Sequence, residues 1–246
     1  MTQIIAHRGS SKVEPENTMP AFQQAYKDGA DGIEIDVQLT KDGEIVVIHD
    51  EKVDRTTNGK GYVKDYSLKE LQKLNANNKF PTIHKVTIPT LIEILEWIVS
   101  NEMTLHIELK NGVVPYPELE EKVIQLIRLY GVENRVILSS FNHYSIVKCY
   151  RLAPEIETAP IYKSGIFMPW VYAQSIRAKG IHPHYLAAPN ELIEESMKNG
   201  IQVRPYTVNK EKDMKRLIEV NCTAFITDYP EKAVRLKEKL KKKTTP

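Results

Sequence analysis

Short apolar runs alternate with amphipathic stretches from one end of the chain to the other. Runs of this length are typical of buried strands. We expect strands at Gln3–Ala6, Gly32–Gln38, Ile45–His49, Thr104–Leu109, Arg135–Ser139, Glu157–Ile161, Gly180–His182, Gln202–Pro205 and Thr223–Ile226. Stretches with helical spacing lie between most of them, at Thr18–Asp28, Leu91–Ser100, Glu118–Tyr130, Tyr144–Leu152, Glu191–Lys198 and Lys210–Val220. This repeated alternation predicts a parallel sheet covered by helices.

The number of these units and the length of the chain favour a closed barrel. The chain has 246 residues, and a (β/α)8 barrel of about 250 residues is a common single-domain fold. The sequence has no Gly-x-Gly-x-x-Gly segment and no P-loop, which argues against an open nucleotide-binding sheet. We therefore predict the α/β class and a (β/α)8 TIM barrel, formed by one domain over residues 1–246.

One region departs from the alternation. Lys41-Asp42-Gly43 predicts a hairpin turn between the second and third expected strands. Residues 50–87 then carry many turn and polar residues, and their one short helix candidate is Ser67–Leu74. We interpret residues 50–87 as a small insertion after the second barrel strand, at the end of the barrel where active sites lie.

Composition narrows the function classes. Hydrophobic residues make up 41% of the chain, enough for a folded core, and 34 basic against 32 acidic residues give a net charge of +2. This balance does not support nucleic acid or a membrane as a partner. Cys149 and Cys222 lack the spacing of a metal or redox pair, so we expect free thiols. Without a signal peptide or a membrane-spanning run, we expect a cytoplasmic protein with no stable membrane association.

Two carboxylates stand in the second expected strand. Glu34 and Asp36 are two positions apart, so both side chains point to the same face of the strand. Neighbouring carboxylates repel each other unless a cation lies between them. Oxygen ligands suit Mg²⁺ or Ca²⁺ better than zinc, since no cysteine is near. A surface strand with outward polar residues explains this segment equally well.

A later strand, Thr104–Leu109, favours the metal site. It alternates in the same way and places His106, Glu108 and Lys110 on one face. Helices cover the outer face of a barrel strand, so the polar face points inward. We predict Glu108 as a third metal ligand and Lys110 as a point charge for a phosphate. The deeper His106 is interpreted as a packed, hydrogen-bonded core residue instead of a ligand.

Two histidines flank the acidic strand. His7 ends the first strand and is followed by Arg8, and His49 ends the apolar run that begins at Ile45. Because imidazoles titrate near neutral pH, such a pair can serve as general acid and general base. The guanidinium of Arg8 offers paired donors that match phosphate oxygens. The sequence therefore predicts a metal site with an acid/base pair acting on a phosphate ester.

Several segments together resemble the signature segments of glycerophosphodiester phosphodiesterases, in particular the compact bacterial cytosolic members. These segments are His7-Arg8-Gly9, Pro15-Glu16-Asn17-Thr18, Gly32 to Asp36, Val37 to Gly43, His49-Asp50, Ile88-Pro89-Thr90-Leu91, Ile107-Glu108-Leu109-Lys110, Ser140-Phe141, Thr207-Val208-Asn209 and Thr227-Asp228-Tyr229-Pro230. They cover nearly the whole chain in the expected order.

The resemblance implies a TIM barrel that hydrolyses glycerophosphodiesters to glycerol 3-phosphate and an alcohol with the help of a divalent cation, Mg²⁺ or Ca²⁺. It implies catalytic His7 and His49, metal ligands Glu34, Asp36 and Glu108, and substrate-binding Arg8, Lys110, Glu16, Asn17, Phe141 and Tyr206. Which histidine is the acid stays open, as does the nucleophile, water or the 2-hydroxyl of the glycerol. The head group of the substrate also stays open.

Some of these positions carry a second interpretation. Asn17 either helps to fix the metal shell or an oxyanion, or caps a helix, or does both. Glu16 either binds substrate or only orients Arg8. Tyr206 stands where the family usually has tryptophan, which leaves the substrate preference open. Thr227 to Pro230 are interpreted mainly as the cap of the last helix.

Three rival functions remain possible on the sequence. A lyase-type phospholipase forming a cyclic phosphate also uses two histidines on a barrel, but it needs a membrane-binding surface or secretion. A metal-dependent isomerase or lyase that stabilises an enolate does not require Arg8 next to His7. A barrel that binds phosphorylated ligands without turnover is disfavoured, because every acid/base and ligand position is filled.

Overall fold

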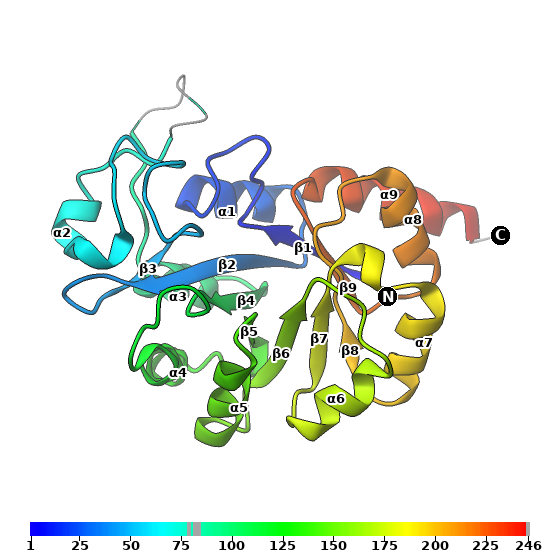
Figure 1. Cartoon of the computed structure of the whole chain (residues 1–246). Helices are drawn as coiled ribbons and strands as arrows, with labels where there is room; N and C mark the ends of the chain where they lie inside the picture. Colours follow the sequence, from blue (N-terminus) through cyan, green and yellow to red (C-terminus); the bar gives the residue numbers. More distant parts are fainter. Residues whose placement is uncertain (78–79, 81–84, 245–246) are drawn as a thin grey trace.

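The computed structural model describes residues 1–77, 80 and 85–244, and it contains a ring of strands with helices around it (Figure 1). In the described residues the strands are β1 (Gln3–His7), β2 (Gly32–Leu39), β3 (Ile45–Val47), β4 (Thr104–Leu109), β5 (Val136–Ser140), β6 (Glu157–Tyr162), β7 (Gly180–Pro183), β8 (Gln202–Val203) and β9 (Ala224–Thr227).

The α-helices and three short 3-10 turns connect these strands. The helices are α1 (Met19–Lys27), α2 (Leu68–Leu71), α3 (Leu91–Val99), α4 (Leu119–Tyr130), α5 (His143–Leu152), α6 (Pro169–Ser175), α7 (Asn190–Lys198), α8 (Glu211–Glu219) and α9 (Pro230–Thr244). The 3-10 turns in the described ranges are η1 (Val63–Asp65), η2 (Glu133–Arg135) and η3 (Tyr185–Ala187).

The described strands form one nine-stranded sheet in the order β8-β7-β6-β5-β4-β2-β1-β9, with β3 paired to β2 beside this path. Neighbours along the path are parallel. The segment after β8 reaches β9, where Ile226 N donates to Pro205 O at 2.9 Å and Val208 N donates to Ile226 O at 2.8 Å. The predicted (β/α)8 TIM barrel is confirmed as a nearly closed parallel ring with helices outside it.

The strands are buried on both faces, as is typical of a parallel sheet that helices cover. Every residue of β2 is buried. Ile33, Ile35 and Val37 belong to an apolar cluster that also contains Leu91 and Ile94 of α3, so this face of the strand packs on the helix layer. The alternate residues of β2 therefore face the interior of the barrel.

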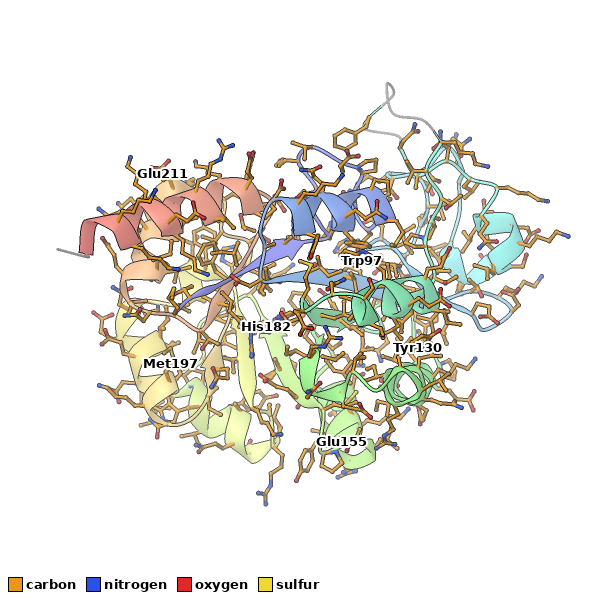
Figure 2. The ribbon with its side chains drawn as sticks, turned by 180° about the vertical axis from the view of Figure 1, so that it is seen from behind. Trp97, Tyr130, Glu155, His182, Met197 and Glu211 are labelled. Carbon is orange, nitrogen blue, oxygen red and sulfur yellow. The ribbon has the colours of Figure 1, made fainter. Side chains whose placement is uncertain are left out.

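The outer layer and the barrel interior can both be seen from behind in Figure 2. Trp97 of α3 meets Tyr26 of α1 edge to face, with ring centroids 6.4 Å apart, so these helices are neighbours on the outside. His182 of β7 lies among the strands and is 1% exposed. His106 of β4 is fully buried and stacks on His182 at 5.7 Å, as expected of a packed core residue. The expected hydrogen bond is wrong, because neither ring nitrogen of His106 has a hydrogen-bond partner among the described residues.

Several element bounds differ from those predicted. The short helix α6 was not predicted, and its start at Pro169 left little helical period to detect. Strand β8 ends at Val203, before Pro205, which has no N–H for a ladder hydrogen bond. Strand β3 ends at Val47, so His49 lies in the loop that follows it.

The hairpin predicted at Lys41-Asp42-Gly43 joins β2 to an antiparallel β3. Beyond β3 the chain builds a small apolar cluster of its own at one side of the barrel, around α2 (Figure 1). Its buried residues include Val53, Val63, Leu71 and Ile88. Residues 78–79 and 81–84 of the predicted insertion lie outside the described residues. We propose that residues 50–87 are an insertion within a single domain of residues 1–246.

Two expectations about the chain as a whole can be compared with the structure. Cys149 and Cys222 are both buried free thiols, as predicted. No helix in the described part of the chain has the length and apolar character needed to cross a membrane.

Candidate active site

The register of three adjacent strands brings the predicted metal ligands together. His7 of β1 pairs with Glu34 of β2, and Asp36 of β2 pairs with Glu108 of β4. Among the described residues, Glu34, Asp36 and Glu108 form a group whose carboxylate oxygens lie within 4.8 Å of one another. Glu34 is 4% exposed and Asp36 is fully buried. The alternative of an outward, solvated polar face is therefore wrong.

The three carboxylates repel one another, and their neighbours shift their pKa values. Burial, together with the neighbouring Asp36 and Glu108, raises the pKa of Glu34 well above its usual range. Burial also acts to raise the pKa of Asp36, but Arg8, His49, Lys110 and the hydrogen bond from Asn17 together outweigh it and lower this pKa to about 2. Among the described residues, Asp36 Oδ1 is buried without a hydrogen-bond partner. Three crowded oxygen donors, one of them with an open acceptor, fit a hard divalent cation.

Two basic side chains lie against these carboxylates. Arg8 Nε is 3.1 Å from Asp36 Oδ2. Lys110 Nζ is 2.9 Å from Glu108 Oε1 and 3.9 Å from Asp36 Oδ1. Burial acts to lower the pKa of Lys110, but Asp36 and Glu108 act in the opposite direction, and the net result is a pKa above the ordinary value. Both side chains also line the adjoining cavity, so their remaining N–H groups can meet a phosphate there.

Asn17 and Glu16 support this cluster from the loop after β1. Asn17 Nδ2 donates to Asp36 Oδ2 at 2.8 Å. The helix-cap interpretation of Asn17 is wrong, because Thr18 holds the cap position of α1 and the Asn17 side chain turns to Asp36 instead. Glu16 Oε1 accepts from Arg8 Nη1 at 2.9 Å, which is the geometry of a carboxylate that orients Arg8.

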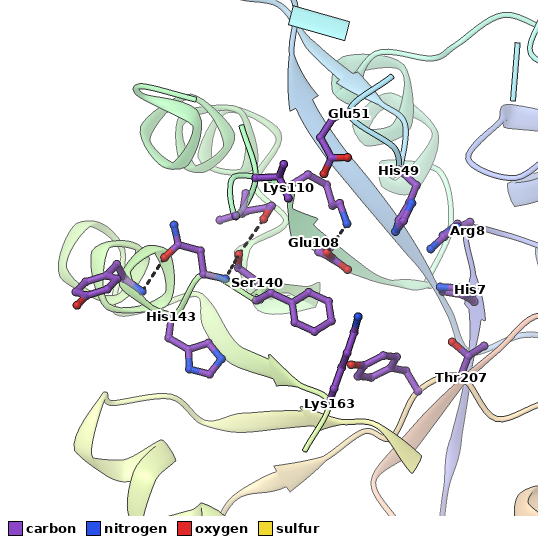
Figure 3. A pocket seen from close by; sticks show the side chains of 17 residues that line it. His7, Arg8, His49, Glu51, Glu108, Lys110, Ser140, His143, Lys163 and Thr207 are labelled. Carbon is purple, nitrogen blue, oxygen red and sulfur yellow. Dashed lines mark hydrogen bonds and ion pairs between the residues drawn. The ribbon is translucent and has the colours of Figure 1, made fainter. Parts of the chain in front are cut away.

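Each of the two histidines is held by an aspartate. His7 Nδ1 lies 2.6 Å from Asp228 Oδ1, and His49 Nδ1 lies 2.6 Å from Asp50 Oδ1. A carboxylate only accepts, so the Nδ1 atom carries the hydrogen in both pairs and Nε2 is left for proton transfer. His7 and His49 line the same side of the cavity with Arg8 between them, opposite Glu108 and Lys110 (Figure 3).

His49 reaches the cavity because β3 runs back along the end of β2. The pairing of β2 with β3 extends from Val37 to Leu39, beyond the part of β2 that pairs with β4 as far as Val37. The loop after β3 therefore returns to the mouth of the barrel. Several influences on the pKa of His49 oppose one another. Burial is the largest of them and lowers this pKa, so the ring is neutral near pH 7.

The residues that orient these histidines were not predicted as site residues from the sequence. Asp228 follows β9 and binds His7, and Asn209 Nδ2 donates to Asp228 Oδ2 at 2.7 Å. The interpretation of Asp228 as part of a helix cap is therefore wrong for its side chain. A signal was present, because Asp228 directly follows a buried strand, as His7 ends one. Asp50 and Arg55 were missed in the same way.

A cavity of about 820 Å³ opens beside the carboxylates and histidines. Its wall includes Phe141 and Tyr206, whose rings meet edge to face at 6.0 Å. Lys163 Nζ lies 5.7 Å from the centroid of the Phe141 ring. His143 also lines the cavity, but its ring nitrogens contact Tyr172 Oη at 2.6 Å and the carbonyl of Ile161 at 2.9 Å. The cavity thus has one strongly charged side and one largely aromatic side.

Comparison with known proteins identifies the family of this chain. Residues 7–232 match the model of the glycerophosphoryl diester phosphodiesterase family. The chain belongs to this family. A glycerophosphodiester phosphodiesterase of Caldanaerobacter subterraneus subsp. tengcongensis is 48% identical, over 97% of this chain and 98% of the relative. A glycerophosphodiester phosphodiesterase of Bacillus altitudinis is 44% identical, over 98% of this chain and all of the relative.

The solved structure of a related phosphodiesterase has the same fold as this chain. An Oleispira antarctica phosphodiesterase in complex with the product sn-glycerol-3-phosphate is 32% identical, with a TM-score of 0.87, and the match covers 97% of each chain. The family predicted from the ordered segments is therefore confirmed, and so is the barrel.

Proposed function

We propose that this protein hydrolyses glycerophosphodiesters to glycerol 3-phosphate and an alcohol. The observation that carries this proposal is that two aspartate-held histidines line one cavity together with Glu108, which belongs to the three-carboxylate cluster. A relative with the same fold, the Oleispira antarctica phosphodiesterase, is in complex with sn-glycerol-3-phosphate. Family membership and the chemistry of the cavity thus support the same reaction.

Glu34, Asp36 and Glu108 would hold a divalent cation, either Mg²⁺ or Ca²⁺, since all three donors are carboxylate oxygens. A cation bound there supplies charge neutralisation of the phosphodiester and of the charge that develops at phosphorus. Asn17 fixes the orientation of Asp36 through its hydrogen bond to that carboxylate.

The substrate is bound by the rest of the cavity wall. Arg8 and Lys110 donate to the phosphate oxygens, and Glu16 keeps Arg8 in place. Phe141 and Tyr206 form the aromatic wall against which the glycerol or the alcohol packs. A phosphate held by the positively charged Arg8 and Lys110 side chains is positioned for attack without reorganisation of the site.

The histidines move the protons. His49 is neutral near pH 7, so its Nε2 can accept the proton of the attacking oxygen. His7 then donates a proton from Nε2 to the oxygen of the leaving alcohol, and Asp228 stabilises the charged form of His7. The attacking oxygen belongs to water or to the 2-hydroxyl of the glycerol, in which case water opens the resulting cyclic phosphate.

Product analysis tests the proposal. The purified protein is incubated with glycerophosphocholine, glycerophosphoethanolamine, glycerophosphoglycerol and glycerophosphoinositol, with Mg²⁺ or Ca²⁺, and phosphorus NMR follows the products. We expect glycerol 3-phosphate and the free alcohol in equal amounts from at least one diester. Failure to cleave any of the four diesters with either cation would refute the proposal.

The rival lyase reaction is not favoured. The named relatives are glycerophosphodiester phosphodiesterases, and the related structure holds an acyclic phosphate product. The same NMR experiment separates the two reactions, because a lyase leaves a cyclic phosphate as its stable product. The cytoplasmic location stays a prediction from the sequence.

A further inference from the structure

One arginine outside the predicted site joins its two halves. Arg55 belongs to the polar segment after β3, and its side chain is 35% exposed. Its guanidinium binds two carboxylates at once, Glu16 from the loop after β1 and Asp50 next to His49. Nothing in the reaction proposed above uses Arg55 directly.

Both contacts are paired hydrogen bonds. Nη1 and Nη2 of Arg55 donate to Glu16 Oε2 and Oε1 at 2.6 and 2.7 Å. Nε and Nη2 donate to Asp50 Oδ2 and Oδ1 at 2.5 and 3.0 Å. A planar guanidinium fixes the distance and angle between two such carboxylates, which an ammonium group cannot do.

Each carboxylate leads to a different part of the site. Asp50 Oδ1 also accepts from His49 Nδ1 at 2.6 Å, so it sets the orientation of the proposed base. Glu16 Oε1 also accepts from Arg8 Nη1 at 2.9 Å, and Arg8 Nε lies against Asp36. A continuous chain of charged hydrogen bonds therefore runs from the imidazole through Arg55 to the phosphate-binding guanidinium.

We propose that Arg55 is a positioning residue that sets His49 and Arg8 relative to each other, and that this is how the segment after β3 becomes part of the catalytic machinery. This inference deepens the proposed function and rests on it. His49 lies in a loop after a short antiparallel strand, so the barrel ladder does not fix it as it fixes His7. Hydrogen bonds from β2 hold only the main chain of this loop, with Ile48 N donating to Asp36 O at 2.9 Å and Gln38 Nε2 donating to Asp50 O at 2.8 Å. The Asp50–Arg55–Glu16 bridge adds a tie between the loop and the barrel through side chains.

The two branches predict different kinetic defects. Loss of the Asp50 branch misorients the base, which acts only in the transition state, so Asp50→Asn lowers kcat and leaves KM nearly unchanged. Loss of the Glu16 branch frees Arg8, so Glu16→Gln mainly raises KM. Arg55→Met combines both defects, with kcat lowered about 10- to 100-fold, the usual effect of losing an orienting partner.

Two further variants separate positioning from bulk stability. Arg55→Lys keeps the charge but cannot bind both carboxylates through paired N–H groups, so kcat/KM stays at least about fivefold below wild type. Arg128→Met is the matched control, because Arg128 makes a comparable two-nitrogen contact with Glu155 on the surface, at 2.9 and 2.6 Å. We expect wild-type kcat and KM from Arg128→Met.

Proton NMR supplies a readout that is independent of turnover. The His49 Nδ1–H hydrogen bonded to Asp50 gives a downfield resonance, identified by its loss in His49→Ala, and Arg55→Met shifts or broadens it while Arg128→Met does not. An unchanged resonance, together with kcat and KM of Arg55→Met within about twofold of the control, overturns the inference. If the wild type cleaves no glycerophosphodiester, the proposed function fails, but the resonance still decides whether Arg55 holds His49.

Discussion

The barrel contains two pairs of histidines, and we propose proton transfer for only one of them. His7 and His49 stand at the mouth of the barrel, each with an aspartate 2.6 Å from Nδ1 and with access to the cavity. His106 and His182 lie inside the barrel, stacked on each other and almost without exposure. The same side chain therefore becomes an acid/base group or a packing element according to its depth along the barrel and to its carboxylate partner.

The electrostatic surroundings of the pairs differ in the same sense. Burial and the nearby Arg204 hold the pKa values of His106 and His182 well below the ordinary range, so both rings stay neutral. Burial lowers the pKa of His49 too, but there Asp36 and Asp50 act in the opposite direction. His7 Nδ1 likewise lies 2.6 Å from the Asp228 carboxylate. Carboxylate neighbours therefore distinguish the pair at the mouth from the interior pair, which lies near Arg204.

The largest effect on activity should come from removal of the cation, because this changes the site at the mouth of the barrel and not the interior pair of histidines. Excess EDTA should abolish turnover, and Glu108→Gln should lower the affinity for Mg²⁺ or Ca²⁺ because one carboxylate ligand is lost. Activity is measured after dialysis and after titration with each cation. Full activity in EDTA would remove the three carboxylates from the mechanism.

Replacing either histidine at the mouth should have the next largest effect. His7→Ala and His49→Ala each remove one proton-transfer group and should lower kcat by at least about 100-fold. His182→Leu is the control from the interior pair and should keep kcat within about threefold of wild type, since no acid/base group is lost. Steady-state kinetics on one diester checks all three variants, and near-normal turnover of His7→Ala or His49→Ala would contradict the assignment.

Removing the aspartate partner of a histidine at the mouth should leave that histidine without a carboxylate at Nδ1, like the histidines of the interior pair. Asp228→Asn keeps the shape of the side chain but loses the carboxylate that accepts from His7 Nδ1, and kcat should fall about 10- to 100-fold. Steady-state kinetics on one diester measures the loss. A kcat equal to that of the wild type would show that Asp228 has no influence on His7.

The smallest effect concerns stability and tests the interior pair alone. The pKa values of His106 and His182 are lowered in the folded state, so the unfolded chain binds more protons below its own histidine pKa of about 6.5. The free energy of unfolding should therefore fall as pH drops below about 6.5, by up to about 1.4 kcal/mol per histidine and pH unit.

The variant His106→Leu/His182→Leu should lose less stability over the same range, because the two buried proton-binding groups are gone. Denaturant unfolding at pH 7 and pH 5 provides the measurement for both proteins. An equal pH dependence in the wild type and the double variant would mean that the interior histidines are not the groups that titrate.

The local sequence pattern predicted many of the site residues but few of the residues that hold them in place. Alternation in β2 and β4 placed Glu34, Asp36 and Glu108 on inward faces, and the register then set Asp36 beside Glu108. The position of His7 at the end of a strand also followed from the pattern. These features depend on the two-residue period of a strand and on the rule that helices cover the outside of a barrel, and both can be applied to the sequence directly.

The sequence by itself therefore determined the barrel, the family and the inward-facing carboxylates, because each depends on short-range periodicity or on ordered motifs. Only the tertiary structure decided that Asp228 binds His7, from the opposite end of the chain, and that Arg55 links Asp50 to Glu16. It also decided that Asn17 turns to Asp36 instead of capping α1. Such pairings arise when the barrel closes and loops meet at its mouth, and no local pattern specifies which loops will meet.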